Sequence, residues 1–375
     1  MGYVAVTGGQ KAIEHASELV KHYRLKDAKE VVSTAQIESQ MRLLIDKVMG
    51  EGGLYAPEYA ALALKQTEGD PAEAAFLLRA YRSTLPRNYY SQTVDPGDMR
   101  VIRRISSSFK DIPGGQLLGP TYDYTHRLLN FDLRNETCAP IESFLDSLHV
   151  PNEKADTKTV QTIQKVADLL REQGLLANRE SIESEPFDIT REMLTFPAPR
   201  SARLQSLARG ETGAMTAMAY SSMRGYGVVH PTIGELRVGY SELHIDYPFG
   251  DEEDSLYIGE VMLTEVETIN SFTQNDQGDV EFMLGYGLTF GQNEVKAISM
   301  AILERSLETS GSSPTQDEEF VLMHIDSVES NGFVSHLKLP HYITFQSMLD
   351  RIRQAKKSEH VSNKNTQQEA IFSHS

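Results

Sequence analysis

Cysteine and tryptophan are almost absent from the sequence. Cys138 is the only cysteine in 375 residues, and there is no tryptophan. A single cysteine cannot close an internal disulfide, and it cannot by itself build a cysteine-rich zinc or iron–sulfur centre. Without tryptophan, a purine ligand would have to stack on tyrosine. The cysteine usage predicts a reduced, cytoplasmic protein.

Basic residues and long apolar runs are also scarce. There are 36 Lys and Arg against 53 Asp and Glu, which gives a net charge of −17. Nucleic-acid phosphates favour positive surfaces, so this balance argues against a nucleic-acid binder, although a local basic pocket for a small polyphosphate remains compatible with it. No run approaches the ~18 apolar residues of a membrane span, and the first residues lack the pattern of a signal peptide. We therefore expect no membrane partner.

The spacing of apolar residues predicts an α+β fold, in which a helical N-terminal region precedes a mixed antiparallel sheet with packed helices. In the helical region, Asp70 is expected to cap a helix that has Pro71 at its first position. Strand-like runs at 237–247, 256–269 and 281–290 precede a helix at 293–308. We divide the chain into a helical region 1–95, a glycine/arginine segment 96–135, a variable linker with one helix 136–200, an α+β region 201–355 and a disordered tail 356–375.

The glycine/arginine segment has the composition of a phosphate site. Arginine binds phosphate oxygens two at a time, and consecutive glycines expose backbone N–H groups to an anion. Pro113-Gly114 suits the centre of a type II turn. No Gly-Lys-Ser or Gly-Lys-Thr follows, so this is not a P-loop, and a turn beside a solvated basic strand is the alternative. The candidate ligand-binding residues are Arg103, Arg104, Lys110, Gly114, Gly115, Tyr122, Tyr124 and Arg127.

Three carboxylates are candidates for catalysis: Asp123, Asp317 and Glu318. Breaking an N-glycosidic bond builds positive charge on the sugar ring, which a carboxylate stabilises while a protonated group assists the leaving group. Asp317 and Glu318 belong to an acidic run, and such runs are also typical of solvated faces. The sequence alone does not choose between these interpretations.

Two histidines near the end of the chain, His336 and His341, are candidate metal ligands. On a helix their rings would point about 140° apart, and on a flat strand they would face opposite sides. Both reach one ion only if the chain bends between them, and Pro340 favours a bend. Two imidazoles do not complete a zinc site, so further ligands would come from elsewhere in the chain or from a partner. Two histidines in a structural turn are the alternative.

Blocks spread over most of the chain resemble the PhnI family, whose members are subunits of the bacterial carbon–phosphorus lyase core complex. The resemblance fades in residues 135–200, in the loop of the 270s and in the tail. The blocks that carry it are 3–13, 62–66, 76–82, 110–129, 224–227, 316–322 and 332–342.

The resemblance implies a ribosyl triphosphate transferase of phosphonate catabolism. Such subunits displace adenine from ATP with a (methyl)phosphonate oxygen, which gives alpha-D-ribose 1-methylphosphonate 5-triphosphate, and in isolation they act as purine nucleosidases on ATP or GTP. Arg103, Arg104 and Arg127 would then hold phosphate or phosphonate oxygens, and Asp123 would act near the ribose.

The resemblance also implies partners and a metal. The expected partners are PhnG-, PhnH-, PhnJ- and PhnL-type subunits. His336 and His341 would share a zinc ion with the PhnJ-type subunit, whose cysteine completes the ligation. Two other hypotheses remain open: a non-catalytic scaffold that supplies zinc ligands to a partner, and a metal hydrolase unrelated to phosphonates.

Overall fold

The computed structural model describes residues 9–147, 163–177, 185–228, 230–250, 254–274 and 278–372. The chain divides into two compact units, one of Met1–Lys29 with Val328–Ser375 and one of Glu30–Ser327. Helices and one antiparallel sheet share the larger unit, which confirms the predicted α+β class.

The larger unit begins with a group of short helices. Residues 34–52 form two helices rather than one, because Met41 leaves the helical conformation (φ −118°, ψ 39°). The predicted cap at Asp70 is confirmed: its Oδ1 accepts hydrogen bonds from Ala72 N (2.9 Å) and Glu73 N (3.3 Å). The helices are α2 (Thr34–Gln40), α3 (Arg42–Gly52), α4 (Pro57–Gln66) and α5 (Pro71–Arg82).

A four-stranded antiparallel sheet, as far as the described residues go, forms the centre of this unit in the order β1-β2-β3-β4. The predicted strand-like runs correspond to β2 (Thr232–Asp246), β3 (Ser255–Gln274) and β4 (Val280–Phe290). The edge strand β1 (Arg100–Ile105) lies at the start of the glycine/arginine segment. In the register of β2 and β3, Arg237 lies opposite Glu265 and Glu235 lies opposite Glu267.

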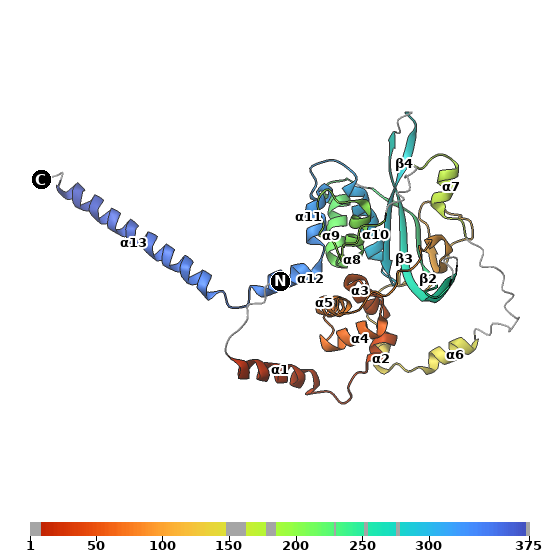
Figure 1. Cartoon of the computed structure of the whole chain (residues 1–375), viewed down its shortest axis with the longest axis horizontal. Helices are drawn as coiled ribbons and strands as arrows, with labels where there is room; N and C mark the ends of the chain where they lie inside the picture. The colour runs from red at the N-terminus through yellow and green to blue at the C-terminus, as the bar shows by residue number, and fades with distance from the viewer. Residues whose placement is uncertain are drawn as a thin grey trace. The chain divides into compact units, whose positions relative to one another are not determined.

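Helix α10 (Glu294–Leu307) covers one face of the sheet (Figure 1). Leu236, Val238 and Val266 pack there against Ala297 and Ala301. Two glycines of β4 let the helix come unusually close. A Cβ on Gly285 would lie 2.3 Å from the carbonyl oxygen of Ala301, and one on Gly287 would lie 2.0 Å from that of Ala297. Helix α10, which corresponds to the helix predicted at 293–308, therefore packs its apolar side chains on this face of the sheet.

The remaining helices of the larger unit are short. The helical stretch that begins at Arg200 is interrupted at Gly210, which ends α8, and it finishes in a π-helical turn, η3 (Ser221–Gly225). Of the helix predicted in the linker, residues 157–162 lie outside the described residues. The other elements are η1 (Pro96–Asp98), η2 (Phe131–Asn135), α6 (Ala139–Ser147), α7 (Val166–Glu172), α8 (Arg200–Arg209), α9 (Thr212–Tyr220), η4 (Pro314–Gln316) and α11 (Glu318–His324).

The smaller unit contains α1 (Gln10–Leu25), most of α12 (Ser327–His336) and α13 (Tyr342–Phe372). A disordered tail was expected from residue 356, whereas α13 continues to Phe372. Residues 341–375 contain no glycine or proline, so the polar composition does not interrupt the helix. Among the described helices, none has the length and apolar character needed to cross a membrane.

Candidate functional site

Two neighbouring arginines of β1 point to opposite faces of the sheet. Successive side chains alternate between faces on a strand, and the register pairs Arg103 with Val238 and Arg104 with Arg237. Both arginines are about 1% exposed. The sequence analysis grouped them in one phosphate site, but the structure does not bring their guanidinium groups together.

Arg104 holds the first half of the glycine/arginine segment. Its Nε donates to Glu235, its Nη1 to the carbonyl oxygens of Pro113 and Gly115 (3.3 Å), and its Nη2 to Gln164 O (3.0 Å). Gly114 has φ +75° and Gly115 N donates to Ile112 O at 2.9 Å, which confirms the predicted type II turn. Each of the three guanidinium nitrogens of Arg104 donates to the protein, so its role in this conformation is to position the turn. Lys110 lies exposed just before that turn.

Arg103 holds the second half of the segment. It donates to the carbonyl oxygen of Leu118 and to the carboxylate of Asp123, and its Nε lies 2.8 Å from Glu294 Oε1 at the start of α10. Gly119 has φ +60°, and a Cβ there would lie 2.5 Å from Ile102 O. Glycine is thus required where the loop returns against β1.

The part of the loop after Gly119 presents side chains to solvent. Tyr124 is 75% exposed, Tyr122 is similarly exposed, and the Arg127 side chain is 65% exposed. Arg127 has a left-handed φ of +52°, and its Nη2 lies 3.5 Å from Asp123 Oδ1. Two aromatic rings and a cation with a single weak partner are therefore accessible to a ligand.

Asp123 stands where the buried and exposed parts of this loop meet. Hydrogen bonds from the Thr121 hydroxyl and from Arg103 outweigh partial burial and hold the pKa of Asp123 below its ordinary value. The carboxylate is therefore ionised near neutral pH. It is suited to stabilising positive charge rather than to donating a proton.

Asp317 and Glu318 have partners in another part of the unit. Asp317 caps α11, and its Oδ1 accepts a hydrogen bond from Phe320 N at 2.9 Å. Glu318 accepts one from Ala198 N at 3.0 Å and lies 3.5 Å from Arg203. Within the described residues, neither carboxylate contacts the segment that carries Asp123.

The sheet face opposite α10 carries buried charges that the sequence analysis did not propose as a site. Arg237 Nε donates to Glu265 Oε2 at 3.1 Å, and Lys165 Nζ lies 2.8 Å from Glu265 Oε1 and 3.5 Å from Glu267. Tyr286 Oη donates to Glu265 Oε1 at 3.1 Å. In the sequence, this face could have been recognised from charged residues that alternate with apolar ones in the middle of two adjacent strand-like runs, those of β2 and β3.

Burial and neighbouring charges shift the pKa values of Glu265 and Glu267, the two buried glutamates of β3, in opposite directions. Burial alone would raise the pKa of Glu265, but Arg237 and Lys165 bring it below its ordinary value. Burial raises the pKa of Glu267, against the weaker opposing effect of Lys165. Burial, with the Glu265 carboxylate beside it, also raises the pKa of Tyr286. Glu265 is thus the firmly ionised member of the pair.

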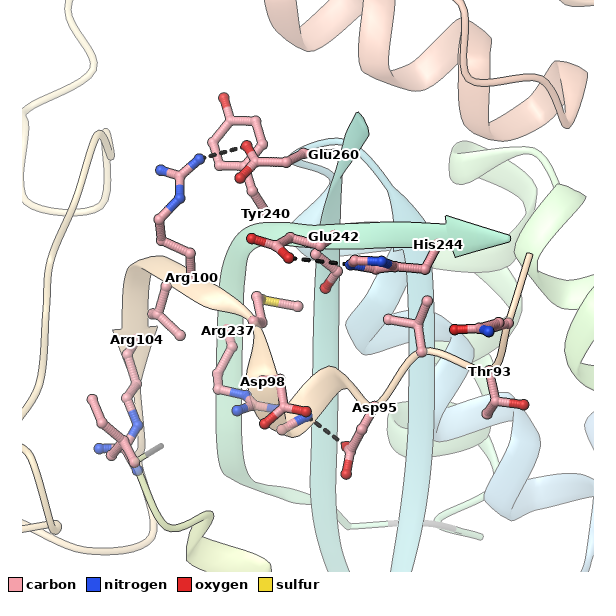
Figure 2. Close-up of a pocket in the computed structure, with 17 residues that line it drawn as sticks. Thr93, Asp95, Asp98, Arg100, Arg104, Arg237, Tyr240, Glu242, His244 and Glu260 are labelled. Carbon is pink, nitrogen blue, oxygen red and sulfur yellow. Dashed lines mark hydrogen bonds and ion pairs between the residues drawn. The ribbon is translucent and has the colours of Figure 1, made fainter. Parts of the chain in front are cut away.

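A pocket of about 630 Å³ lies beside this face, between β1 and β2 and the η1 segment that crosses them (Figure 2). Arg104 and Arg237 line it from the strands, Asp95 and Asp98 from the η1 segment, and Ser241 and His244 from the far part of β2. Its volume is within the ~300–1,000 Å³ typical of small-molecule sites. Arg104 thus connects the type II turn to a pocket.

In the smaller unit, the chain bends between the two candidate metal ligands, as predicted. Helix α12 ends at His336 and α13 begins after His341, and the ring centroids are 5.2 Å apart. Two imidazoles bound by their outer nitrogens to one tetrahedral zinc ion, with Zn–N ~2.0–2.1 Å, have ring centres about 5 Å apart. The pair therefore has the spacing of two zinc ligands.

Backbone carbonyls also orient these rings. His341 Nδ1 lies 2.7 Å from Leu339 O, and His336 Nδ1 contacts Phe333 O. A carbonyl only accepts, so each Nδ1 carries the proton and each Nε2 keeps its lone pair for a metal. Within the described chain no group of three or more His, Cys, Asp or Glu forms a complete metal site. The two histidines thus fit half of a zinc site.

Sequence comparison places the chain in a family. The profile of the bacterial phosphonate metabolism protein family, PhnI, matches residues 2–359, and the chain belongs to that family. HtxH of Stutzerimonas stutzeri is 50% identical over 364 residues, 94% of this chain and 95% of that protein.

Two further relatives carry a more specific name, alpha-D-ribose 1-methylphosphonate 5-triphosphate synthase subunit PhnI. The protein of Escherichia coli (strain K12) is 47% identical over 365 residues, 95% of this chain and 99% of the relative. The protein of Rhizobium meliloti (strain 1021) is 43% identical over 363 residues, 95% of each chain.

Proposed function

We propose that this chain is the subunit of a carbon–phosphorus lyase system that replaces the adenine of ATP with a (methyl)phosphonate. A phosphonate oxygen forms a bond to the anomeric carbon of the ribose as the carbon–nitrogen bond to adenine breaks. Adenine leaves with the bonding electron pair and takes up a proton. The product is alpha-D-ribose 1-methylphosphonate 5-triphosphate, inverted from β to α, and water replaces the phosphonate when the chain acts alone as a nucleosidase.

Similarity over almost the whole chain to two proteins named as subunits of this synthase carries the proposal. The aligned share of 95% includes both the glycine/arginine segment and the histidine pair. The exposed loop adds support from chemistry, because it offers stacking rings, an accessible cation and an ionised carboxylate together.

The residues of the loop divide into contact and positioning roles. Arg127 would bind triphosphate or phosphonate oxygens, and Tyr122 or Tyr124 would stack on the purine. Asp123, held ionised by Arg103, would stabilise the positive charge that develops on the ribose. Arg103 and Arg104 would act as positioning residues through the loop that each one holds.

We further propose that His336 and His341 hold a zinc ion through their Nε2 atoms, and that a partner subunit of the PhnJ type completes the site. When bound, zinc would supply a Lewis acid and a firm link to that partner. His341→Ala should reduce the zinc content of the purified complex. His324→Ala is the control, since His324 Nδ1 contacts only Phe320 O of its own helix within the described residues.

Base release tests the proposed activity directly. The purified chain is incubated with ATP or GTP, then with methylphosphonate and the companion subunits, and free purine and the ribosyl product are measured by chromatography. We expect purine release by the chain alone and the phosphonate product with the companions. Arg127→Ala should raise the KM for ATP about 10- to 100-fold, the loss of one charge-assisted contact, and Arg351→Ala on α13 serves as the exposed control.

A non-catalytic scaffold is the alternative function. It is favoured by a run of exposed apolar side chains in and after the loop, which would suit contact with other subunits. Intact nucleotide in every incubation, with zinc retained in the complex, would support the scaffold and contradict the transferase. The exposed apolar residues are Leu128, Leu129, Phe131, Leu133, Ile141 and Phe144.

A further inference from the structure

The pocket in Figure 2 lies where the pairing of this part of the chain with β2 is interrupted. The chain contacts β2 where Ser91 lies opposite Ile245 and where Gln92 N donates to His244 O at 2.7 Å. It pairs again from Arg100, opposite Tyr240. The residues from Thr93 to Met99 leave the strand in between, so that part of β2 faces a cavity instead of a neighbouring strand.

The strand side of the pocket holds two hydrogen-bond donors without partners. Arg237 uses Nε and Nη2 for Glu265 and Pro96 O (2.8 Å), and its Nη1 donates to none of the described residues. Ser241 is only 3% exposed, yet its Oγ has no hydrogen-bond partner among the residues that the structure describes. An unpartnered buried hydroxyl is costly, which indicates that a ligand or ordered water occupies this side. We call Arg237 and Ser241 the strand wall.

Charge behind the strand wall is balanced. Arg104, Arg237 and Lys165 face the carboxylates of Glu235, Glu265 and Glu267. What the strand wall offers to the pocket is a guanidinium N–H of Arg237 and the hydroxyl of Ser241, and an oxyanion accepts hydrogen bonds from both.

The opposite side of the pocket is acidic. Asp95 and Asp98, both exposed, line it from the η1 segment, which we call the η1 wall. Asp95 Oδ1 accepts a hydrogen bond from Gly97 N at 2.7 Å, whereas the Asp98 carboxylate accepts none from the described residues. A plain anion would be repelled by the η1 wall, and a plain cation would be repelled by the strand wall.

We propose that this pocket binds a small zwitterion, with its oxyanion on Arg237 and Ser241 and its ammonium group on Asp98 and Asp95. An aminoalkylphosphonate and an amino acid share this chemistry. The two walls are joined by the hydrogen bond from Arg237 to Pro96 O, so their opposite charges are held at a fixed spacing. The inference does not depend on the proposed transferase reaction.

Equilibrium binding to the full chain tests the proposal without turnover. The probes are 2-aminoethylphosphonate, β-alanine, ethylphosphonate and ethylammonium, measured by calorimetry in the absence of nucleotide. We expect at least one of the two zwitterions to bind about 10- to 100-fold more tightly than either single-charge probe, the value of one charge-assisted contact. Tighter binding of 2-aminoethylphosphonate identifies a phosphonate ligand, and tighter binding of β-alanine identifies an amino acid.

Three variants connect binding to the two walls. Asp98→Asn should weaken binding of the preferred zwitterion to the level of the probe that lacks the ammonium group. Ser241→Ala should weaken the zwitterion and its anion-only analogue about equally, and Asp132→Asn, an exposed change on η2, should alter neither. The proposal is overturned if no zwitterion binds, if the single-charge probes bind equally well, or if Asp98→Asn behaves like Asp132→Asn.

Discussion

Replacing Lys296 with methionine tests the most deeply buried charge of the larger unit. Lys296 is fully buried on α10, and its Nζ has no hydrogen-bond partner within the described residues. The space around the amine is limited, because a Cβ on Gly50 would lie 3.3 Å from Nζ. Burial lowers the pKa of Lys296 from 10.5 to about 8, against the attraction of the Glu51 carboxylate.

The magnitude and sign follow from this pKa. A fall from 10.5 to about 8, at ~1.36 kcal/mol for each pKa unit, makes the charged amine less favourable in the fold by about 3 kcal/mol. Between these two values the unfolded chain holds the proton and the folded chain does not. Since stability rises with pH wherever the unfolded state binds more protons, the unfolding free energy should increase from about pH 8 to pH 10.5 through this residue.

Urea unfolding followed by far-ultraviolet circular dichroism measures the effect at several pH values. The stability of Lys296→Met relative to the natural protein should be higher at pH 7.5 than at pH 10 by about 2–3 kcal/mol. Titration of the other lysines and of the tyrosines occurs in both proteins and cancels in this difference. Lys29→Met, an exposed change, should show no such trend.

A second pair of variants separates the effect of Lys296 from that of Glu51. Burial raises the pKa of Glu51, and removing Lys296 leaves that carboxylate without its nearest compensating charge. The comparison of Glu51→Gln with Glu51→Gln/Lys296→Met removes the contribution of the Glu51 carboxylate. The relative stability of the form with methionine at position 296 should still be higher at pH 7.5 than at pH 10. A stability difference that stays constant from pH 7.5 to pH 10 in both comparisons would refute the assignment of a buried, weakly basic amine.

Other substitutions test packing, capping and the loop. Gly287→Ala places a Cβ 2.0 Å from Ala297 O and should lower the unfolding free energy by about 1–3 kcal/mol or more, whereas a loss below experimental error would contradict the close approach of α10. Asp70→Ala should cost about 1 kcal/mol in urea unfolding, and Asp70→Asn much less. Arg104→Ala should lower the unfolding free energy by about 3–5 kcal/mol, because it leaves Glu235 buried without its ion-pair partner. Because Arg104 positions the turn at Gly114, the variant should also weaken ATP binding in equilibrium dialysis; unchanged ATP binding would show that this turn does not position the ATP site.

Local rules predicted much of the fold. Asp70 caps its helix and Pro113-Gly114 forms its turn because capping and turn chemistry depend on only a few neighbouring residues. The strand-like runs of β2, β3 and β4 were visible because their apolar faces alternate. The bend between His336 and His341 followed from Pro340, whose effect on the backbone is also local.

Long-range pairing accounts for what the sequence did not predict. The separation of Arg103 from Arg104 follows from the strand conformation of β1 and its pairing with β2, a strand more than 120 residues further along the chain. The partners of Arg104 include Glu235 and Gln164, which are distant along the chain, so its burial could not be read from its own neighbourhood. The charged runs of β2 and β3 were compatible with a solvated face until the register placed Arg237 opposite Glu265.

Arg103 and Arg104 of β1 support the glycine/arginine segment from opposite faces of the sheet. Arg104 depends on the charged face, through Glu235, and Arg103 depends on the start of α10, through Glu294. The exposed groups between Tyr122 and Arg127 are therefore positioned by contacts on both faces of the sheet. Since Asp123 bonds Arg103 directly, Arg103→Lys should disturb Asp123 and the rate of base release, whereas Arg104→Lys should act mainly on the turn at Gly114 and on the pocket. Equal effects of the two variants on kcat would contradict this division.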